Sequence, residues 1–405
     1  MTDPIVTDAP RAERTDDGAI RVTSATNGGA PLWFSVPEEH AELLSARADH
    51  IAVGLLLPAM RYGRDLHVGG TVTGGLLHRL NHEVQSLVRQ VHPTYSQVVV
   101  TAENLAASLP RAAGIATGFS GGIDSMAVLS EYALARDVPD ELRVTHLLSN
   151  NVGAHGTGGH PLWLARFQAL LPVAKELQLP FIMVDSNLED HYPRMGFFET
   201  VTFRNAAVAH LLAGGIGRLH YASGESFRSV QIPTDGDIGT VDTMSLPLLS
   251  TLGLSLDSAN SDLSRVEKTL ALIGNPYARY LDVCVDTDAT RSANCSRCWK
   301  CMRAMFTLEV AGALDDFTPT PFSREPYDQA RRAFVAGLLA DERANYRDVV
   351  EFADSQGWKW GAGNRMRGLS VKAYRRSKSA AGQARARLRG STARQIHVTD
   401  AQTRA

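Results

Sequence analysis

The segment around residue 120 restricts the fold of this chain more than any other feature. The apolar run GIATGF ends at Phe119 and leads into SGGIDS at 120–125, and apolar residues at helical spacing follow from Met126 to Tyr132. A strand, a glycine turn and a helix in this order direct backbone N–H groups and the positive end of a helix dipole toward one point. The pattern therefore predicts a phosphate-binding turn.

The same alternation of strand and helix continues along the chain. Strand-like runs are found at 143–148, 181–184 and 219–223, and helical patterns at 162–177 and 205–213. Strands that alternate with helices form a parallel sheet covered on both faces. We therefore predict an α/β fold with a doubly wound parallel sheet.

Flanking segments extend this predicted sheet domain on both sides. Residues 1–18 lack hydrophobic periodicity and are predicted to be a disordered leader. Residues 19–109 combine strand-like runs with a helical pattern at 76–88 and are expected to form a small N-terminal α/β domain. The sheet domain is assigned to 110–315, with a capping box that starts a helix at Ser264. Residues 316–405 are expected to be a helical, basic C-terminal extension.

The chemistry of the predicted turn suits a phosphate ligand. Because Gly121 and Gly122 have no side chain, the backbone can approach a phosphate closely, and Ser120 and Ser125 offer hydroxyl donors. Asp124 lies in the first helical turn, where its oxygens suit Mg²⁺. A Walker-type loop is excluded because it requires a lysine at this turn and the first lysine of the chain is Lys175.

SGGIDS resembles the SGGxDS signature of the PP-loop ATP pyrophosphatases, which cleave ATP between the α and β phosphates. The resemblance implies a PP-loop fold of the adenine nucleotide alpha hydrolase type, ATP and Mg²⁺ as cofactors, and a catalytic role for Asp124. It also implies nucleotide contacts from the loop that follows the next strand. His155 and His160 lie in the same loop and are predicted to be solvated. The implied ATP-binding residues are Ser120, Gly121, Gly122, Ile123, Asp124, Ser125, Asn150, Asn151 and Gly153.

All four cysteines of the chain lie in one short segment. Cys284, Cys295, Cys298 and Cys301 have the spacing C-x10-C-x2-C-x2-C, which suits a tetrahedral Zn²⁺ site. An iron–sulfur cluster is the alternative with the same ligands. A redox-active or sulfur-carrying cysteine pair is a third alternative, and it would require a thiolate free of metal.

The order of these features resembles the 7-cyano-7-deazaguanine synthase branch of PP-loop enzymes, which convert a carboxylate to a nitrile with ATP and ammonia. Besides SGGIDS, the likeness is carried by FRNAAVAHLLAGGIGRLHYASGES and NCSRCWKCMRA, and it spans about 113–311. It implies that Arg204 and Asn205 lie in the ligand pocket, with Arg204 as a catalytic cation that holds an anionic oxygen. An ion pair at a helix start is the alternative role for Arg204.

This chain also departs from the branch. It carries about a hundred residues before the loop and an extension after the cysteines, and it has Ala222–Ser226 where the branch usually has Gly-Val-Asn and an acidic residue. We expect an AMP-forming ligase that adenylates a carboxylate or amide-type oxygen and replaces it with nitrogen. Its substrates would be a small-molecule acid and a nitrogen donor, or a protein partner in a conjugation. A sulfur-inserting nucleic-acid modification enzyme and a non-catalytic nucleotide-binding scaffold are the alternatives.

Charge is distributed unevenly along the chain. Residues 355–399 contain eleven of the 41 Lys and Arg residues and no Asp or Glu. Such a segment suits a nucleic-acid or protein partner, although a solvated basic end gives the same composition. No apolar stretch reaches the ~20 residues of a membrane span. Because the cysteines are clustered as in metal sites of reducing compartments, we expect a cytoplasmic protein.

Overall fold

The computed structural model describes residues 3–372, except residues 157, 234–235, 286–293, 342, 362, 364–365, 369 and 371. Its largest element is an eight-stranded sheet with the order β11-β10-β7-β8-β9-β4-β3-β2. These strands are β2 (Arg11–Arg14), β3 (Ala19–Ser24), β4 (Leu32–Pro37), β7 (Gly114–Gly118), β8 (His146–Asn150), β9 (Phe181–Ser186), β10 (Ile216–Ala222) and β11 (Ser255–Ala259).

The sheet is mixed. The strands from β11 to β9 are parallel to their neighbours, whereas β4 pairs antiparallel with β9, and β3 and β2 continue in antiparallel order. The predicted α/β class is therefore confirmed, and the expectation of a wholly parallel sheet is corrected by the three antiparallel strands at one edge.

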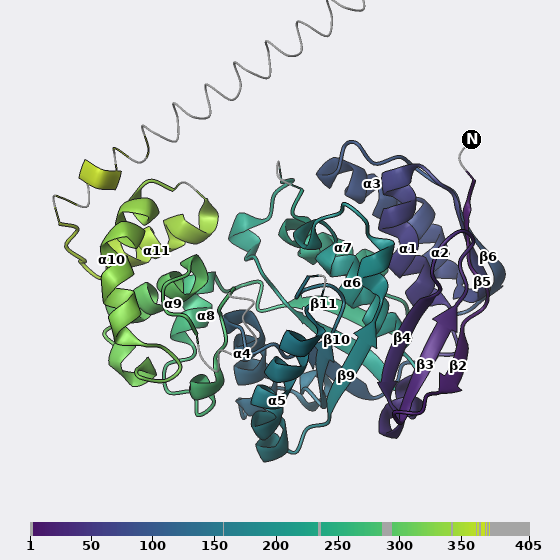
Figure 1. Cartoon of the computed structure of the whole chain (residues 1–405), viewed down its shortest axis with the longest axis horizontal. Coiled ribbons are helices and arrows are strands. Elements are labelled where there is room, and N and C mark those ends of the chain that lie inside the picture. The colour runs from purple at the N-terminus through teal and green to yellow at the C-terminus, as the bar shows by residue number, and fades with distance from the viewer. Residues whose placement is uncertain are drawn as a thin grey trace, which may run out of the picture.

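Helices cover both faces of the parallel strands (Figure 1). Adjacent residues of one strand point to opposite faces, and Leu147 and Leu148 of β8 belong to two different hydrophobic clusters. One cluster contains α1 (Asp49–Tyr62), α6 (Phe197–Leu211) and α7 (Asp242–Leu249). The other contains α4 (Ile123–Leu129), α5 (His160–Leu177) and α9 (Trp299–Val310).

A second sheet lies at the N-terminal end of the molecule. It has the order β1-β5-β6, from β1 (Ile5–Val6), β5 (Leu66–Thr73) and β6 (Val100–Ala106). The helical pattern at 76–88 forms two helices, α2 (Gly74–Asn81) and α3 (Glu83–Val91), because His82 between them has a non-helical backbone. We call residues 3–106 the N-terminal unit.

The expectation of a disordered leader over 1–18 is wrong for the described residues 3–18. Ile5 and Val6 pair with β5, and Arg11–Arg14 pair with β3. All four residues of β2 are exposed, so the strand carries no apolar alternation that the sequence could reveal. Charged side chains on an exposed edge strand discourage pairing with other chains.

The N-terminal unit shares its core with the rest of the molecule. Phe34 of β4 pairs with Ser186 of β9, and α1 packs along α6. One hydrophobic cluster contains buried residues from both sides of the boundary expected near residue 110. The boundary therefore does not separate two cores.

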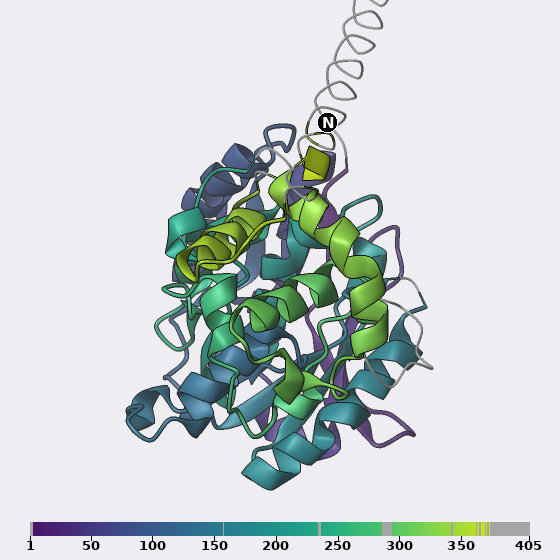
Figure 2. The same cartoon turned by 90° about the vertical axis from the view of Figure 1, so that its left-hand side faces the viewer.

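The C-terminal helices pack at the opposite end of the molecule, as Figures 1 and 2 show. The predicted capping box is confirmed at α8 (Arg265–Leu270), because Ser264 Oγ accepts from the N–H of Glu267 at 3.2 Å. The extension adds α10 (Arg324–Leu339) and α11 (Ala344–Ser355). Trp360 packs over Phe306 of α9, with ring centroids 5.9 Å apart.

The basic segment predicted at 355–399 falls mostly on residues 373–399, outside the described part of the chain. Within the described part, Trp358 and Trp360 pack against α9 and belong to a third hydrophobic cluster. Of the helices that are described, none is long and apolar enough to cross a membrane.

We predict that Phe34→Ala destabilises the whole chain in one cooperative transition. Phe34 is fully buried in the shared core, so its truncation should cost about 3–5 kcal/mol. Urea unfolding followed by far-UV circular dichroism and by tryptophan fluorescence should give coincident, equally shifted curves. Ala12→Ser on the exposed strand β2 is the control. Two separate transitions, of which only one shifts, would contradict a shared core.

Candidate functional site

A cavity of about 540 Å³ lies at the carboxyl ends of β7, β8 and β10. After β7 the chain builds β8 and β9 on one side and then returns to place β10 on the other side of β7. Ligands of open α/β sheets bind outside the carboxyl ends of strands at such a reversal. The cavity is therefore in the position where this topology favours a ligand.

The SGGIDS segment forms the floor of this cavity. Gly121 has φ +74°, a value that glycine adopts without strain, and a side chain there would meet Leu170 and the backbone oxygen of Tyr280. Ser125 Oγ donates to Gly122 O at 3.0 Å and accepts from Ser120 N–H at 3.3 Å. These bonds close the turn immediately before α4, so the first N–H groups of the helix lie at the cavity.

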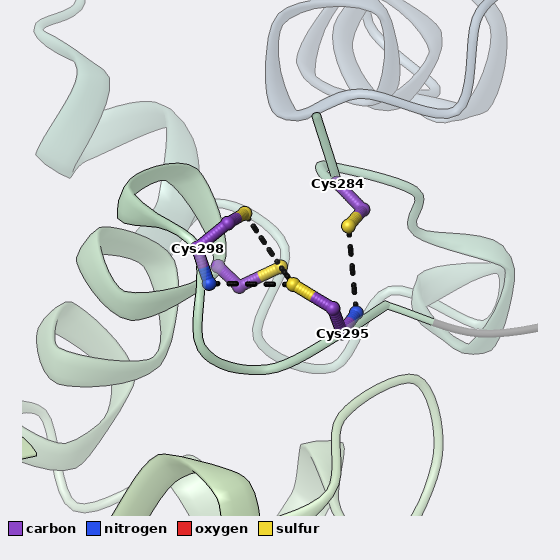
Figure 3. Close-up of side chains that lie close together, drawn as sticks. Cys284, Cys295 and Cys298 are labelled. Atoms are coloured by element: carbon purple, nitrogen blue, oxygen red, sulfur yellow. Dashed lines mark hydrogen bonds between the residues drawn. The ribbon is translucent and has the colours of Figure 1, made fainter. Parts of the chain in front are cut away.

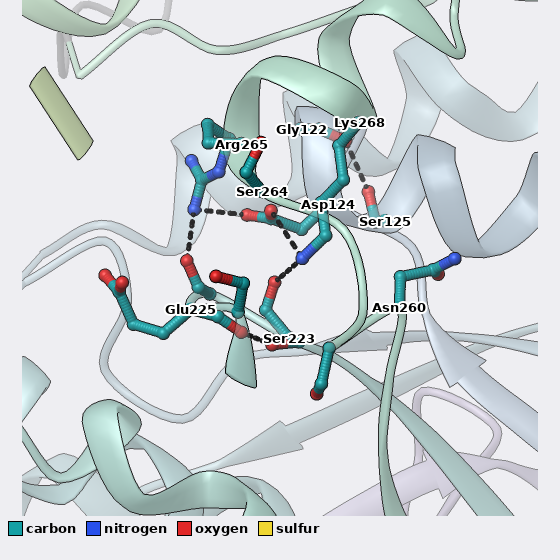
Figure 4. Close-up of polar contacts among 12 residues, drawn as sticks. Gly122, Asp124, Ser125, Ser223, Glu225, Asn260, Ser264, Arg265 and Lys268 are labelled. Carbon is teal, nitrogen blue, oxygen red and sulfur yellow. Dashed lines mark hydrogen bonds and ion pairs between the residues drawn. The ribbon is translucent and has the colours of Figure 1, made fainter. Parts of the chain in front are cut away.

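Asp124 on this turn holds two basic residues of α8 (Figure 4). Arg265 Nη2 lies 2.9 Å from Asp124 Oδ2 and also donates to Gly224 O at 3.0 Å. Lys268 Nζ lies 3.7 Å from Asp124 Oδ1 and donates to Ser223 O at 2.7 Å. The aspartate therefore joins the turn to α8 and to the segment after β10.

Two further cations reach the cavity from α9. Lys300 and Arg303 both line it, and neither has an ion pair or side-chain hydrogen bond with another described residue. Arg303 is only 4% exposed, and burial lowers its pKa to about 10, so it stays charged at neutral pH. We call Arg265, Lys268, Lys300 and Arg303 the cation cluster.

The acidic residues of the cavity lining are already paired. Asp124 is held by Arg265, and Asp282 lies 3.0 Å from Arg166 Nε. Lys300 and Arg303 therefore have no ion-pair partner of their own within the described cavity wall, although Asp124 stabilises both charges from a distance. A buried cation without a partner is costly, and an anionic ligand would remove that cost.

Aromatic side chains also line the cavity. Trp163 donates to Ser149 Oγ at 2.8 Å, and Phe167, Phe197 and Phe198 line the same space. His155, predicted to be solvated, also lines it, and burial followed by the nearby Arg166 lowers its pKa to about 4. His155 is therefore neutral at pH 7. The cavity wall therefore combines the cations of α8 and α9 with aromatic side chains, among which Arg166 is paired with Asp282.

The structure brings most of the predicted ATP-binding residues to this cavity. Ser120, Gly122, Ile123, Asp124, Ser125 and Asn150 line it, as does Asn205. Gly121 lies in the same turn but is not among the residues that line the cavity. Asn151 and Gly153 do not line the cavity: Asn151 donates to Asp185 Oδ1 at 2.6 Å, and Gly153 lies against Glu189 and Arg204.

Arg204 occupies a different position from the one the resemblance implies. It lies in the middle of α6, not at its start, is fully buried, and is absent from the described cavity lining. Its guanidinium pairs with Glu189 and donates to Val152 O at 2.8 Å. Of the alternative role, an ion pair at a helix start, the structure shows the ion pair but places it in the middle of the helix, and Nη2 of Arg204 has no hydrogen-bond partner among the described residues.

The four cysteines converge on one point, as Figure 3 shows for the labelled three. Their sulfur atoms all lie within 4.8 Å of one another, and the Cys298 and Cys301 sulfurs are 3.4 Å apart. Tetrahedral Zn²⁺ with bonds of about 2.3 Å requires sulfur separations of about 3.8 Å. The neighbouring Cys301 thiol lowers the pKa of Cys298 to about 4, which favours the thiolate that a metal binds. The cluster fits a metal such as zinc.

The cysteine cluster adjoins the cavity. Cys284 lines the cavity, and Cys298 directly precedes α9, which begins at Trp299. Lys300 and Arg303 lie in the first turns of that helix, so a metal bound to Cys298 and Cys301 would fix the helix that carries them. The cation cluster was not predicted, although basic residues at helical spacing in SRVEK and on either side of Cys301 are a usable signal.

Comparisons with protein-family models, with curated proteins and with solved structures find no match for this chain.

We predict that the purified protein carries zinc and that Cys301→Ser abolishes its binding. Cys301 is fully buried in the cluster, so the variant should lose the metal and its thermal midpoint should fall, as should that of wild type treated with a chelator. Metal content by mass spectrometry and thermal unfolding measure both effects. Arg297→Gln, an exposed position within the same segment, is the control. Protein without zinc or iron, whose melting the chelator leaves unchanged, would contradict a metal centre.

Proposed function

We propose that this chain binds ATP over SGGIDS and splits it to AMP and pyrophosphate in order to activate an acid. The observation that carries the proposal is the meeting of this turn with Arg265, Lys300 and Arg303 in one cavity at the sheet reversal. A doubly wound PP-loop fold of the adenine nucleotide alpha hydrolase type, with β7 leading into the loop, is part of the proposal.

The charges of the cavity support a polyphosphate ligand. Lys300 and Arg303 lack anionic partners among the described residues, and the start of α4 adds backbone donors. A triphosphate would bring several negative charges to these groups, and charge that develops on the pyrophosphate leaving group would be stabilised there. The aromatic side chains of Trp163 and Phe167 suit the adenine base.

Mg²⁺ fits the same cavity. Proteins commonly hold it with one or two carboxylates and the phosphates of the ligand, and Asp124 is the carboxylate of the turn. The two oxygens of Asp124 contact Arg265 and Lys268. A phosphate bound to Mg²⁺ at Asp124 would therefore also lie close to these two cations. Mg²⁺ would neutralise charge on the phosphates, whereas residues of the chain would orient the ligand.

In the proposed reaction an anionic oxygen of the substrate attacks the α-phosphorus of ATP, and pyrophosphate leaves. A nitrogen donor then attacks the acyl adenylate, the new C–N bond replaces the C–O bond, and AMP departs. This C–N bond-forming ligase chemistry is similar to that of 7-cyano-7-deazaguanine synthase, acting on the same or another small acid or as a conjugation to a protein partner. The chain would act in the cytoplasm.

The metal centre weighs against the sulfur-inserting alternative. All four sulfur atoms lie within 4.8 Å of one another, so a metal shared by them would leave no cysteine of the chain as a free sulfur carrier. A non-catalytic scaffold differs from the proposed enzyme in one measurable respect, since it would bind ATP without releasing pyrophosphate.

We predict that ATP, Mg²⁺ and a suitable carboxylic acid give AMP and pyrophosphate, and that Arg303→Gln weakens ATP binding about ten- to a hundredfold. A hydrogen bond to a charged group contributes about 1.5–3 kcal/mol. Calorimetry measures the affinity, and a coupled phosphate assay with a panel of acids measures pyrophosphate. Arg297→Gln, an exposed arginine of the same segment, is the control.

Asp124→Asn tests the turn itself. The neutral amide cannot hold Arg265 and Lys268 as the carboxylate does, so pyrophosphate release should fall by at least about a hundredfold. Full activity of this variant would exclude the proposed role of the turn.

A further inference from the structure

We propose that Arg204 is a positioning residue that links the N-terminal unit to the loop after β8, so that residues 3–106 hold this loop in its binding conformation. The proposal rests on the proposed function in one respect, namely that the loop adjoins the nucleotide. We call residues 150–156 the β8 loop. The link runs from α1 through Tyr192 and Arg204 to Gly153.

Arg204 is held within the protein through Nε and Nη1, whereas its buried Nη2 has no hydrogen-bond partner among the described residues. Its Nε donates to Thr200 Oγ1 at 2.7 Å, and its Nη1 donates to Val152 O at 2.8 Å and pairs with Glu189. The guanidinium stacks on the ring of Tyr192, at 4.1 Å from the ring centroid. These contacts join α6 to the β8 loop and to the segment before α6.

The β8 loop is shaped around this ion pair. Gly153 has φ +102°, and a Cβ at this position would overlap both Glu189 and Arg204. Its neighbours Val152, Ala154 and His155 line the cavity. The position of the Glu189–Arg204 pair therefore determines where the cavity-lining residues of the loop lie.

Tyr192 carries the link into the N-terminal unit. Its hydroxyl donates to Gly54 O of α1 at 2.5 Å, and the side chain is fully buried. In a regular helix the N–H of residue 58 would donate to Gly54 O, but residue 58 is proline and has no N–H. The tyrosine hydroxyl therefore donates to a carbonyl oxygen that lacks its usual donor within the helix.

Two further bonds fix the segment that follows Tyr192. Tyr62 of α1 donates to Pro193 O at 2.5 Å, and His92 Nε2 lies 3.1 Å from Glu199 O in the first turn of α6. Phe197 and Phe198, which line the cavity, lie between these two points. The N-terminal unit thus holds both the start of α6 and, through Arg204, the β8 loop.

Tyr192→Phe tests the link because it removes only the hydroxyl. Loss of this hydrogen bond should cost about 0.5–1.5 kcal/mol. We therefore expect the rate of amide exchange in residues 150–156 and the Kd for ATP each to rise about two- to tenfold, whereas kcat should be nearly unchanged. Hydrogen exchange by mass spectrometry and calorimetry measure the two effects. Tyr95→Phe is the matched control, because the buried Tyr95 hydroxyl of the N-terminal unit has no hydrogen-bond partner.

Arg204→Lys gives a second, independent probe. It should loosen the β8 loop as Tyr192→Phe does, and the double variant should show less than the sum of the two effects, since both act through one link. Thermal unfolding of each variant first establishes that it is folded.

The outcomes separate the proposals. The link is excluded if folded Tyr192→Phe matches Tyr95→Phe in loop exchange and in ATP affinity. A direct ligand role for Arg204 replaces positioning if Arg204→Lys weakens ATP binding without faster loop exchange. If wild type binds no ATP, the proposed function fails, and loop exchange still decides whether the link exists.

Discussion

Buried positive charge at the carboxyl ends of β7 and β10 is the constraint on which the rest of the structure depends. Arg265 and Lys268 are held there by Asp124, and Arg303 is buried without an anionic partner among the described residues. Such a concentration of charge requires rigid supports. The fold provides them on one side through the capped helix α8, and on another through α9, whose first residues adjoin the cysteine cluster.

Both ends of the chain support this centre. The C-terminal helices pack Trp360 and Val349 against Phe306 of α9, so the extension stabilises the helix that carries Lys300 and Arg303. The N-terminal unit packs against α6 on the other face of the sheet. The segments before β7 and after α9 therefore contact helices next to the cavity.

Local patterns were sufficient to predict the elements around the cavity. The glycine turn, the strand and helix alternation, the capping box at Ser264 and the cysteine spacing each involve residues close in sequence. The pairing of β4 with β9 gave no local signal, since both strands are apolar and their partners are distant. Arg204 was predicted to contact a ligand because the sequence does not show that Glu189 reaches it. The exposed strand β2 has a polar sequence typical of disorder.

The antiparallel pairing of β4 with β9 also has a consequence for the order in which the chain acquires structure. Trp33 and Asn187, which are hydrogen-bonded beside this pair, are separated by 154 residues. During synthesis the first hundred residues emerge long before β9 and α6, so the apolar surfaces of β4 and α1 that face those elements stay uncovered until they arrive. A nascent chain of this protein therefore exposes an apolar surface until about half of its length has been synthesised.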